Sequence, residues 1–151
     1  MQYIIRKAVK ADIPQILSCL SVLSDVSGEP KKIETAFILR RLDILTFVIE
    51  DPGIPASQNT YEILPKILGT ASLVLISKLS HNGRSVGYID DVAVLDDYQG
   101  LGLGHLLIEK LIEEASSFGC YKVILNCKKS LRGYYKKFGF KKSGIEMRLD
   151  L

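Results

Sequence analysis

The sequence predicts an α/β protein of the α+β kind, in which helices flank a mixed and mostly antiparallel central sheet. Strand-like and helical segments follow one another in the order β-α-α-β-β-β-α-β-α-β. Two long strand-like runs are joined by the turn signal His81-Asn82-Gly83, which is typical of a hairpin. The chain has 151 residues, of which 47% are apolar, so a single domain over residues 1–151 is expected.

In the first half of the chain, short strands alternate with helices. We expect Tyr3–Ala8 to form an edge strand and Asp12 to cap a helix that ends at about Ser24. Apolar residues recur in that helix with the 3.6-residue period of one buried face. The further elements expected here are a helix over 32–42, a strand over 46–50 and a mobile, proline-containing surface loop over 51–65.

The second half carries the clearest patterns. The predicted hairpin consists of Ile67–Lys78 and Ser85–Val94. The glycine-rich segment DYQGLGLG follows at 97–104 and opens an amphipathic helix, His105–Phe118, which Gly119 is expected to terminate. The remaining expected elements are a strand over 122–126, a short helix over 131–138 and a last strand over 142–149.

Composition excludes several classes of protein. The formal charge of +3 is too small to indicate a nucleic-acid partner. No apolar run is long enough to span a membrane, and the N-terminus has no secretory signal pattern. Cys19, Cys120 and Cys127 are odd in number and scattered, which favours a reduced, cytoplasmic setting over a disulfide framework.

The glycine-rich turn is a candidate anion site. It lies between a strand and a helix, where glycine allows close approach of a ligand and the first helical N–H groups lack partners. No Gly-Lys-Ser/Thr follows, so it is not a P-loop, and no βαβ unit starts here, so it is not a dinucleotide fingerprint. A plain glycine-rich turn without a ligand is the alternative.

Two motifs carry a family resemblance. Gln99–Gly104 has the pattern Gln/Arg-x-x-Gly-x-Gly/Ala, and Tyr134–Phe140 is similar to a Y-x-x-x-G-F element. Together they resemble the acetyl-CoA loop and the following helix of the GNAT acyltransferase superfamily. The resemblance implies the GNAT acyl-CoA N-acyltransferase fold and acetyl-CoA as co-substrate, and we expect no metal.

Other segments resemble one branch of that superfamily, the glucosamine 6-phosphate N-acetyltransferases. These segments are Lys78-x-x-His81, Tyr88–Val94, Gly119–Lys122 and Gly144–Met147. The resemblance implies acetylation of the sugar amine by direct attack in a ternary complex, on the route to UDP-N-acetylglucosamine. It also implies a homodimer in which both chains contribute to each sugar site. The alternatives are a GNAT enzyme for another small amine or a protein N-terminus, and a non-catalytic acyl-CoA-binding module.

The candidate catalytic residues are Asp91, Tyr135 and Asp90. Neighbouring residues of a regular strand point to opposite faces, but the family resemblance implies a bulge here. By the same resemblance both acids hold the amine and the sugar hydroxyls, with Asp91 orienting the amine or accepting its proton. Tyr135 is the candidate general acid for the departing thiolate, and a buried structural tyrosine is the alternative. The cysteines have no paired histidine to support nucleophilic catalysis.

The resemblance also implies binding residues. The backbone of the central strand would bind the pantetheine arm. For several of the basic residues, the alternative to binding a ligand is an ordinary surface lysine in solvent. The cofactor set is Val92, Ala93, Val94, Gln99, Gly100, Leu101, Gly102, Leu103, Gly104, Asn126, Tyr135 and Lys137. The substrate set is Ser24, Lys78, His81, Asp90, Asp91, Tyr121, Lys122 and Arg148.

The chain departs from the branch pattern at a few positions. Asn126 stands where the family usually has an acid, and Asp90 where it typically has the longer Glu. Leu131 replaces an Asn, Tyr88 replaces a His, and Asp150 replaces a basic residue whose role Arg148 is expected to take. Residues 128–142 hold seven basic residues and no acid, which suits the phosphates of CoA.

Overall fold

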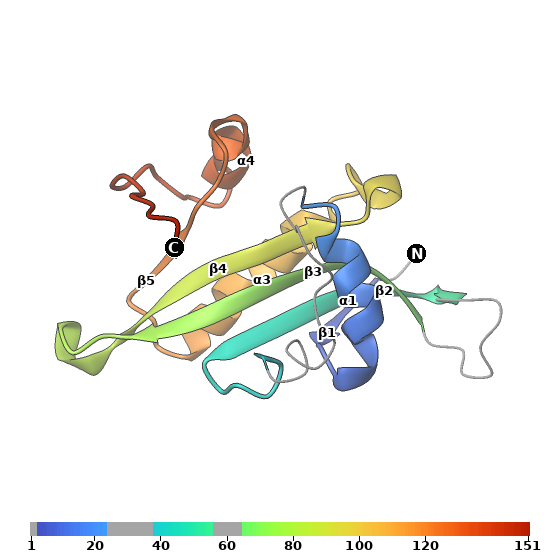
Figure 1. Cartoon of the computed structure of the whole chain (residues 1–151), viewed down its shortest axis with the longest axis horizontal. Helices are drawn as coiled ribbons and strands as arrows, with labels where there is room; N and C mark the ends of the chain where they lie inside the picture. The colour runs from blue at the N-terminus through green and yellow to red at the C-terminus, as the bar shows by residue number, and fades with distance from the viewer. Residues whose placement is uncertain (1–2, 24–37, 56–64) are drawn as a thin grey trace.

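The computed structural model describes residues 3–23, 38–55 and 65–151, and its centre is one five-stranded sheet (Figure 1). The strands lie in the order β1-β2-β3-β4-β5; the first four pair antiparallel, and β5 is parallel to β4. The strands are β1 Ile4–Lys7, β2 Ile44–Pro55, β3 Pro65–Ser77, β4 Ser85–Val94 and β5 Lys122–Leu125. The predicted mixed, mostly antiparallel sheet is confirmed.

Helices cover both faces of the sheet. α1 (Ile13–Leu20) packs on one face, where its Ile16 and Cys19 join a buried cluster with Val48 of β2. α3 (Leu103–Ser117) packs on the other face, and α4 (Arg132–Lys136) follows β5. The buried residues of α3 recur every three or four positions, which forms one apolar helix face: Leu103, Leu107, Ile108, Leu111 and Ala115.

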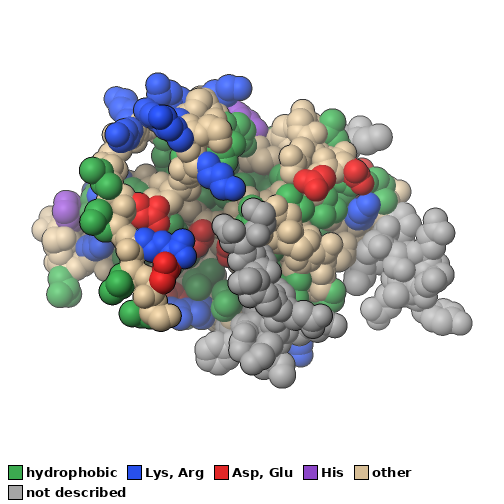
Figure 2. Space-filling model, turned by 45° about the horizontal axis from the view of Figure 1, so that its top comes forward, with side chains coloured by type: hydrophobic (Ala, Val, Ile, Leu, Met, Phe, Trp, Pro, Cys, Tyr) green, Lys and Arg blue, Asp and Glu red, His purple; other side chains and the backbone are tan. Residues whose placement is uncertain are grey.

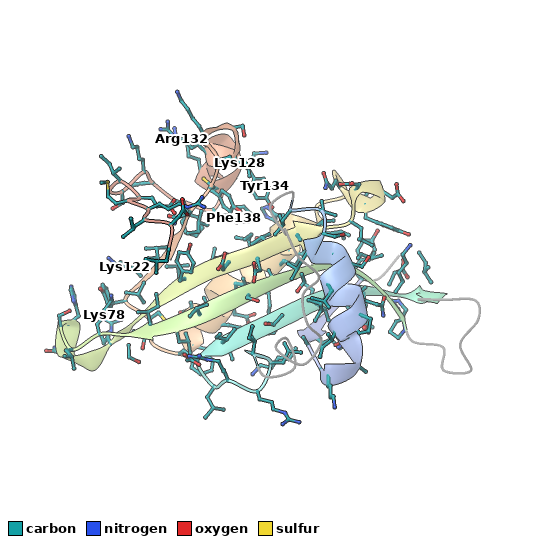
Figure 3. All side chains as sticks on the ribbon, viewed as in Figure 1. Lys78, Lys122, Lys128, Arg132, Tyr134 and Phe138 are labelled. Carbon is teal, nitrogen blue, oxygen red and sulfur yellow. The ribbon has the colours of Figure 1, made fainter. Side chains whose placement is uncertain are left out.

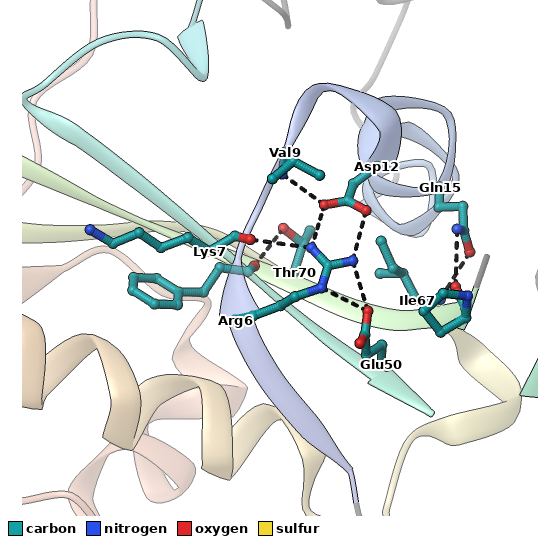
Figure 4. Close-up of polar contacts among 10 residues, drawn as sticks. Arg6, Lys7, Val9, Asp12, Gln15, Glu50, Ile67 and Thr70 are labelled. Atoms are coloured by element: carbon teal, nitrogen blue, oxygen red, sulfur yellow. Dashed lines mark hydrogen bonds and ion pairs between the residues drawn. The ribbon is translucent and has the colours of Figure 1, made fainter. Parts of the chain in front are cut away.

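A buried ion network ties β1, α1 and β2 together (Figure 4). Arg6 on β1 donates to both carboxylate oxygens of Asp12, at 2.7 and 2.9 Å, and to Glu50 of β2 at 2.8 Å. Asp12 is 3% exposed and Glu50 is 6% exposed. Gln15 then links α1 to the start of β3, because its side-chain oxygen accepts from the N–H of Ile67 at 2.9 Å.

Several predicted boundaries are wrong. The first helix ends at Leu20 rather than near Ser24. The expected loop over 51–65 is strand at both ends, because β2 continues to Pro55 and β3 begins at Pro65. Register shifts between β2 and β3 around Asp51 accommodate the prolines, which irregular pairing tolerates. The rest of that loop, and most of the helix expected over 32–42, lie outside the described residues.

The predicted last strand over 142–149 does not form in the single chain. Its apolar side chains Ile145, Met147 and Leu149 are 85%, 89% and 84% exposed. A strand needs a neighbouring strand to accept and donate its backbone hydrogen bonds, and none lies beside this segment among the described residues. The alternating apolar pattern is therefore present without a partner.

Candidate active site

A β-bulge lies in the centre of β4. Thr70 of β3 pairs with Ala93 and Ser72 pairs with Asp90, so two residues of β4 face one residue of β3. Asp91 has φ +52°, the left-handed conformation that few residues other than glycine adopt. The extra residue changes the alternation of side chains, because Ile89 and Val92 both contact the α3-side core.

The bulge lies where β4 and β5 part. The parallel pairing of these strands runs from Val86 with Lys122 to Ile89 with Leu125, and β5 then ends. Beyond Ile89, the outer edge of β4 has no partner strand within the described residues. Among Val92, Ala93 and Val94, the backbone groups that point to this outer edge are thereby available to an extended ligand, except the carbonyl of Val94, which accepts from the Gln99 side chain. These are the residues predicted to bind the pantetheine arm.

The glycine-rich loop completes the far end of this edge. Gly100 and Gly102 have φ of +79° and +81°, and a Cβ on either would meet no atom within 4 Å. Gly102 is the N-cap of α3, and no side chain caps the helix there. The first N–H groups of α3 thus have no capping side chain, and uncapped N–H groups at a helix start are the kind that bind phosphate. The Gln99 side chain instead closes the turn by donating to the carbonyl of Val94 at 3.1 Å.

Two adjacent tyrosines dock α4 beside this loop. A Cβ on Gly104 would lie 3.0 Å from the Tyr134 hydroxyl, so Tyr134 lies against the first turn of α3. Phe138 packs on the ring of His105 of α3 with ring centres 4.4 Å apart (Figure 3). Tyr135 is 9% exposed and packs edge-on against Phe140. Burial, helped by Tyr134 and Cys127, raises the pKa of Tyr135 to about 12, so its hydroxyl keeps its proton at neutral pH.

Asp90, Asp91 and Tyr88 form a polar patch at the bulge. Asp91 is open to solvent, yet the protein around it, followed by the charge of Asp90, raises the pKa of its carboxyl. The pKa of the Tyr88 hydroxyl is raised by burial first and then by Asp90 and Glu146, while contact with Asn126 acts the other way. Asn126 therefore lies at this patch, where an amide can donate or accept a hydrogen bond but cannot take a proton.

The residues predicted to bind the sugar phosphate form a second group. The rings of His81 and Tyr121 stack with centres 4.3 Å apart, and Lys122 lies over the Tyr121 ring at 5.4 Å. Arg84, which the sequence analysis did not select, lies over the same ring at 6.0 Å and donates to the carbonyl of Gly119. Its position in the hairpin, close to His81 and directly before β4, is the sequence feature that could have indicated it.

This His81 group lies far from the bulge within one chain. The N–H of Tyr121 donates to the carbonyl of Ser85 at the start of β4, whereas Asp91 lies near the other end of that strand. The usual rise per residue separates Ser85 from Asp91 by roughly 20 Å. Lys78 lies further out, at the hairpin tip (Figure 3). One chain therefore does not bring His81 or Lys78 to Asp91, although Lys122 and Tyr135 line one cavity.

The other predicted ligands are placed as follows. Arg148 is exposed and pairs with Asp150 at 2.6 Å, its one ion pair within the described residues. Ser24 lies outside the described residues. Lys137 and Leu101 are exposed, on the segment after α4 and in the glycine-rich loop. Figure 2 shows Lys and Arg side chains gathered at the end of the molecule where α4 lies.

A cavity of about 760 Å³ runs along the outer edge of β5. α4 and the segment that follows it form its other wall, and Tyr135, Asn126 and Lys122 all line it. Lysine and arginine side chains predominate around it, against the single acid Glu146: Lys122, Lys129, Arg132, Lys136, Lys141 and Lys142. Tyr135 thus borders an open space as well as the core.

Comparison with known proteins identifies the family. The model of the acetyltransferase (GNAT) family matches residues 27–140. This chain belongs to the GNAT acetyltransferase family. The family uses acetyl-CoA as co-substrate.

Individual GNAT relatives cover most of the chain. A protein from Trypanosoma brucei brucei named glucosamine 6-phosphate N-acetyltransferase is 46% identical over 66% of this chain and 67% of its own length. Glucosamine 6-phosphate N-acetyltransferase 1 of Oryza sativa is 34% identical over 97% of this chain and 86% of its own. The crystal structure of the Arabidopsis thaliana glucosamine-6-phosphate N-acetyltransferase superposes with a TM-score of 0.83 at 28% identity, covering 99% of both chains.

The described residues contain neither a membrane-spanning helix nor a cluster of metal ligands. None of their helices combines the length and apolar character that crossing a membrane requires. No three His, Cys, Asp or Glu side chains among them come together as metal ligands would. Cys19, Cys120 and Cys127 are free thiols, and Cys19 is buried.

Proposed function

We propose that this GNAT protein transfers the acetyl group of acetyl-CoA to the amine of D-glucosamine 6-phosphate, giving N-acetylglucosamine 6-phosphate and CoA. The observation that carries the reaction class is the open edge of β4, which has an acid at its bulge and a phosphate-binding helix terminus at its end. The names of relatives that match at 34–46% identity support the substrate. Three free cysteines suit a reducing, cytoplasmic location.

The proposed mechanism needs no covalent enzyme intermediate. The pantetheine arm lies along Val92–Val94, where a backbone N–H polarises the thioester carbonyl. Asp91 orients the sugar amine and accepts its proton, directly or through water, as the nitrogen attacks the carbonyl carbon. The tetrahedral intermediate then expels the CoA thiolate. The hydroxyl of Tyr135, whose raised pKa keeps it protonated, gives its proton to the departing sulfur.

We propose further that the active unit is a homodimer whose sugar sites are shared. The His81 group supplies the cations and donors that a sugar phosphate needs, but it lies roughly 20 Å from Asp91 of the same chain. We infer that a second copy of the chain supplies the His81 group that faces Asp91. The alternating exposed residues Ile145, Met147 and Leu149 support this proposal, because they match the unpaired outer edge of β5 in a second chain.

Mixing two variants that each have little activity of their own tests the shared site. One chain carries Asp91→Asn, and the other carries His81→Ala and Lys122→Ala. Each mixed dimer should hold one site with intact Asp91 and an intact His81 group. Since half of randomly formed dimers are mixed, co-expression should restore about a quarter of wild-type activity. No recovery above the two single variants, with dimers present by light scattering, would refute a site built from two chains.

A thiol-release assay with a panel of amines tests the substrate. We expect CoA release with glucosamine 6-phosphate and little with glucosamine, because the phosphate is what the His81 group recognises. Turnover confined to polyamines, aminoglycosides or peptide N-termini would assign a different GNAT substrate. Acetyl-CoA binding without turnover on any amine would refute the enzymatic proposal.

A further inference from the structure

Asp90 carries a contact that distinguishes it from Asp91. Its Oδ1 accepts a hydrogen bond from the backbone N–H of Asp91 at 3.0 Å. This N–H belongs to the extra residue of the bulge, which the regular ladder between β3 and β4 leaves unpaired. It is also the residue with φ +52°. The Asp90 carboxylate therefore satisfies the backbone group that the unusual conformation exposes.

The neighbours of Asp90 leave it free for this contact. Ser72 lies directly opposite Asp90 on β3, but its hydroxyl bonds to Thr46 on β2 at 3.0 Å. Within the described residues, the N–H of Asp91 is the one hydrogen-bond partner of the Asp90 side chain. Because a left-handed conformation is unfavourable for a residue with a side chain, a local hydrogen bond to its N–H helps to hold Asp91 in it.

Side-chain length makes the contact specific to Asp90. An aspartate oxygen returns to the next backbone N–H through a short ring, whereas Glu, which is longer by one methylene, reaches outward instead. The shorter acid thus fits the backbone of the bulge better than it fits a distant sugar hydroxyl.

We propose that Asp90 is a positioning residue, which holds the bulge so that Asp91 alone presents its carboxylate to the acceptor amine. This inference rests on the proposed function for its kinetic consequences. Its structural part, the hydrogen bond to the N–H of Asp91, holds without any substrate. The two parts can therefore be tested separately.

A matched pair of variants separates hydrogen bonding from charge. Asp90→Asn keeps an acceptor oxygen at the same reach and loses the charge, whereas Asp90→Glu keeps the charge and loses the reach. We expect Asp90→Glu and Asp90→Ala to lower kcat about ten-fold or more, and Asp90→Asn to lower it at least about three-fold less than either of them, because only Asp90→Asn keeps an acceptor at the right reach. In an Asp91→Asn background, Asp90→Ala should lower kcat by no more than about three-fold, because it acts through Asp91.

Hydrogen exchange of the Asp91 amide, measured by NMR without substrate, provides the independent readout. Exchange should be faster in Asp90→Ala and Asp90→Glu than in wild type, and Asp90→Asn should restore the slow rate. The proposal is overturned if Asp90→Glu is active while Asp90→Asn raises KM ten-fold, which would make Asp90 a charged substrate ligand. Equal amide exchange in all four proteins would also overturn it. If no sugar amine is acetylated, the proposed function fails, and the exchange series still decides whether Asp90 holds the bulge.

Discussion

In the proposed mechanism, the hydroxyl of Tyr135 supplies the proton that the departing thiolate takes up. Because burial raises its pKa to about 12, the group stays protonated throughout the ordinary pH range and can serve as an acid. We expect Tyr135→Phe to lower kcat roughly 100-fold and to change the KM for acetyl-CoA by less than about three-fold. Steady-state kinetics of Tyr135→Phe and Tyr134→Phe provide the comparison. An unchanged kcat in Tyr135→Phe would remove Tyr135 from the mechanism.

In the proposed mechanism, Asp91 determines how kcat/KM changes as the pH falls. Its carboxyl pKa is raised by burial and by Asp90, so Asp91 takes up a proton at a higher pH than an ordinary aspartate, near 3.9. As the pH falls, the proton acceptor is lost early, and kcat/KM should decline at a pH above that ordinary value. A pH profile of kcat/KM checks this. A rate that stays constant down to pH 4 in a folded enzyme would contradict the role of Asp91.

At the scale of elements, the close approach of β3 to β4 fixes the position of Val92–Val94, where the pantetheine arm is proposed to lie. A Cβ on Gly69 of β3 would lie 2.8 Å from the carbonyl oxygen of Ala93 and 3.1 Å from the Val94 side chain. Gly69→Ala should therefore push β4 away, cost about 1–3 kcal/mol of unfolding free energy and raise the KM for acetyl-CoA. Gly133→Ala is the control, because a Cβ there meets nothing within 4 Å. Equal stability and equal KM in the two variants would refute this reading of the edge.

The joint between β1, α1 and β2 depends on Arg6. Without the guanidinium, the buried carboxylates of Asp12 and Glu50 would lose their shared partner. We expect Arg6→Ala to lower the unfolding free energy by about 2–3 kcal/mol, somewhat less than for a fully buried pair because Arg6 is partly exposed. Urea denaturation measures this, with the exposed neighbour variant Lys7→Ala as control. If both variants unfold at the same urea concentration, the network does not stabilise the fold.

Local signals in the sequence predicted the hairpin and the cofactor loop well. β4 has its predicted bounds because Asn82 and Gly83 adopt the left-handed turn that their types favour. The glycines of the loop were predictable for the same reason. The bulge at Asp91 followed from the family resemblance, since regular alternation alone would have placed Asp90 and Asp91 on opposite faces.

Features of the whole molecule were harder to predict from the sequence. The apolar alternation over 142–149 predicted a strand, which is wrong for the single chain because this segment pairs with none of the described strands. The charge pattern was more informative: the seven basic residues of 128–142 leave the rest of the chain with 13 basic against 17 acidic residues, a balance of −4.

The central claim for the whole molecule is that one acetyl group passes from acetyl-CoA to the nitrogen of glucosamine 6-phosphate. Incubation with acetyl-CoA carrying a ¹³C-labelled acetyl group, followed by NMR and mass spectrometry of the product, tests it most directly. The account predicts labelled N-acetylglucosamine 6-phosphate and CoA in equal amounts, with the label in an amide. Label that stays on CoA in the presence of the sugar phosphate, while another amine is acetylated, would contradict it.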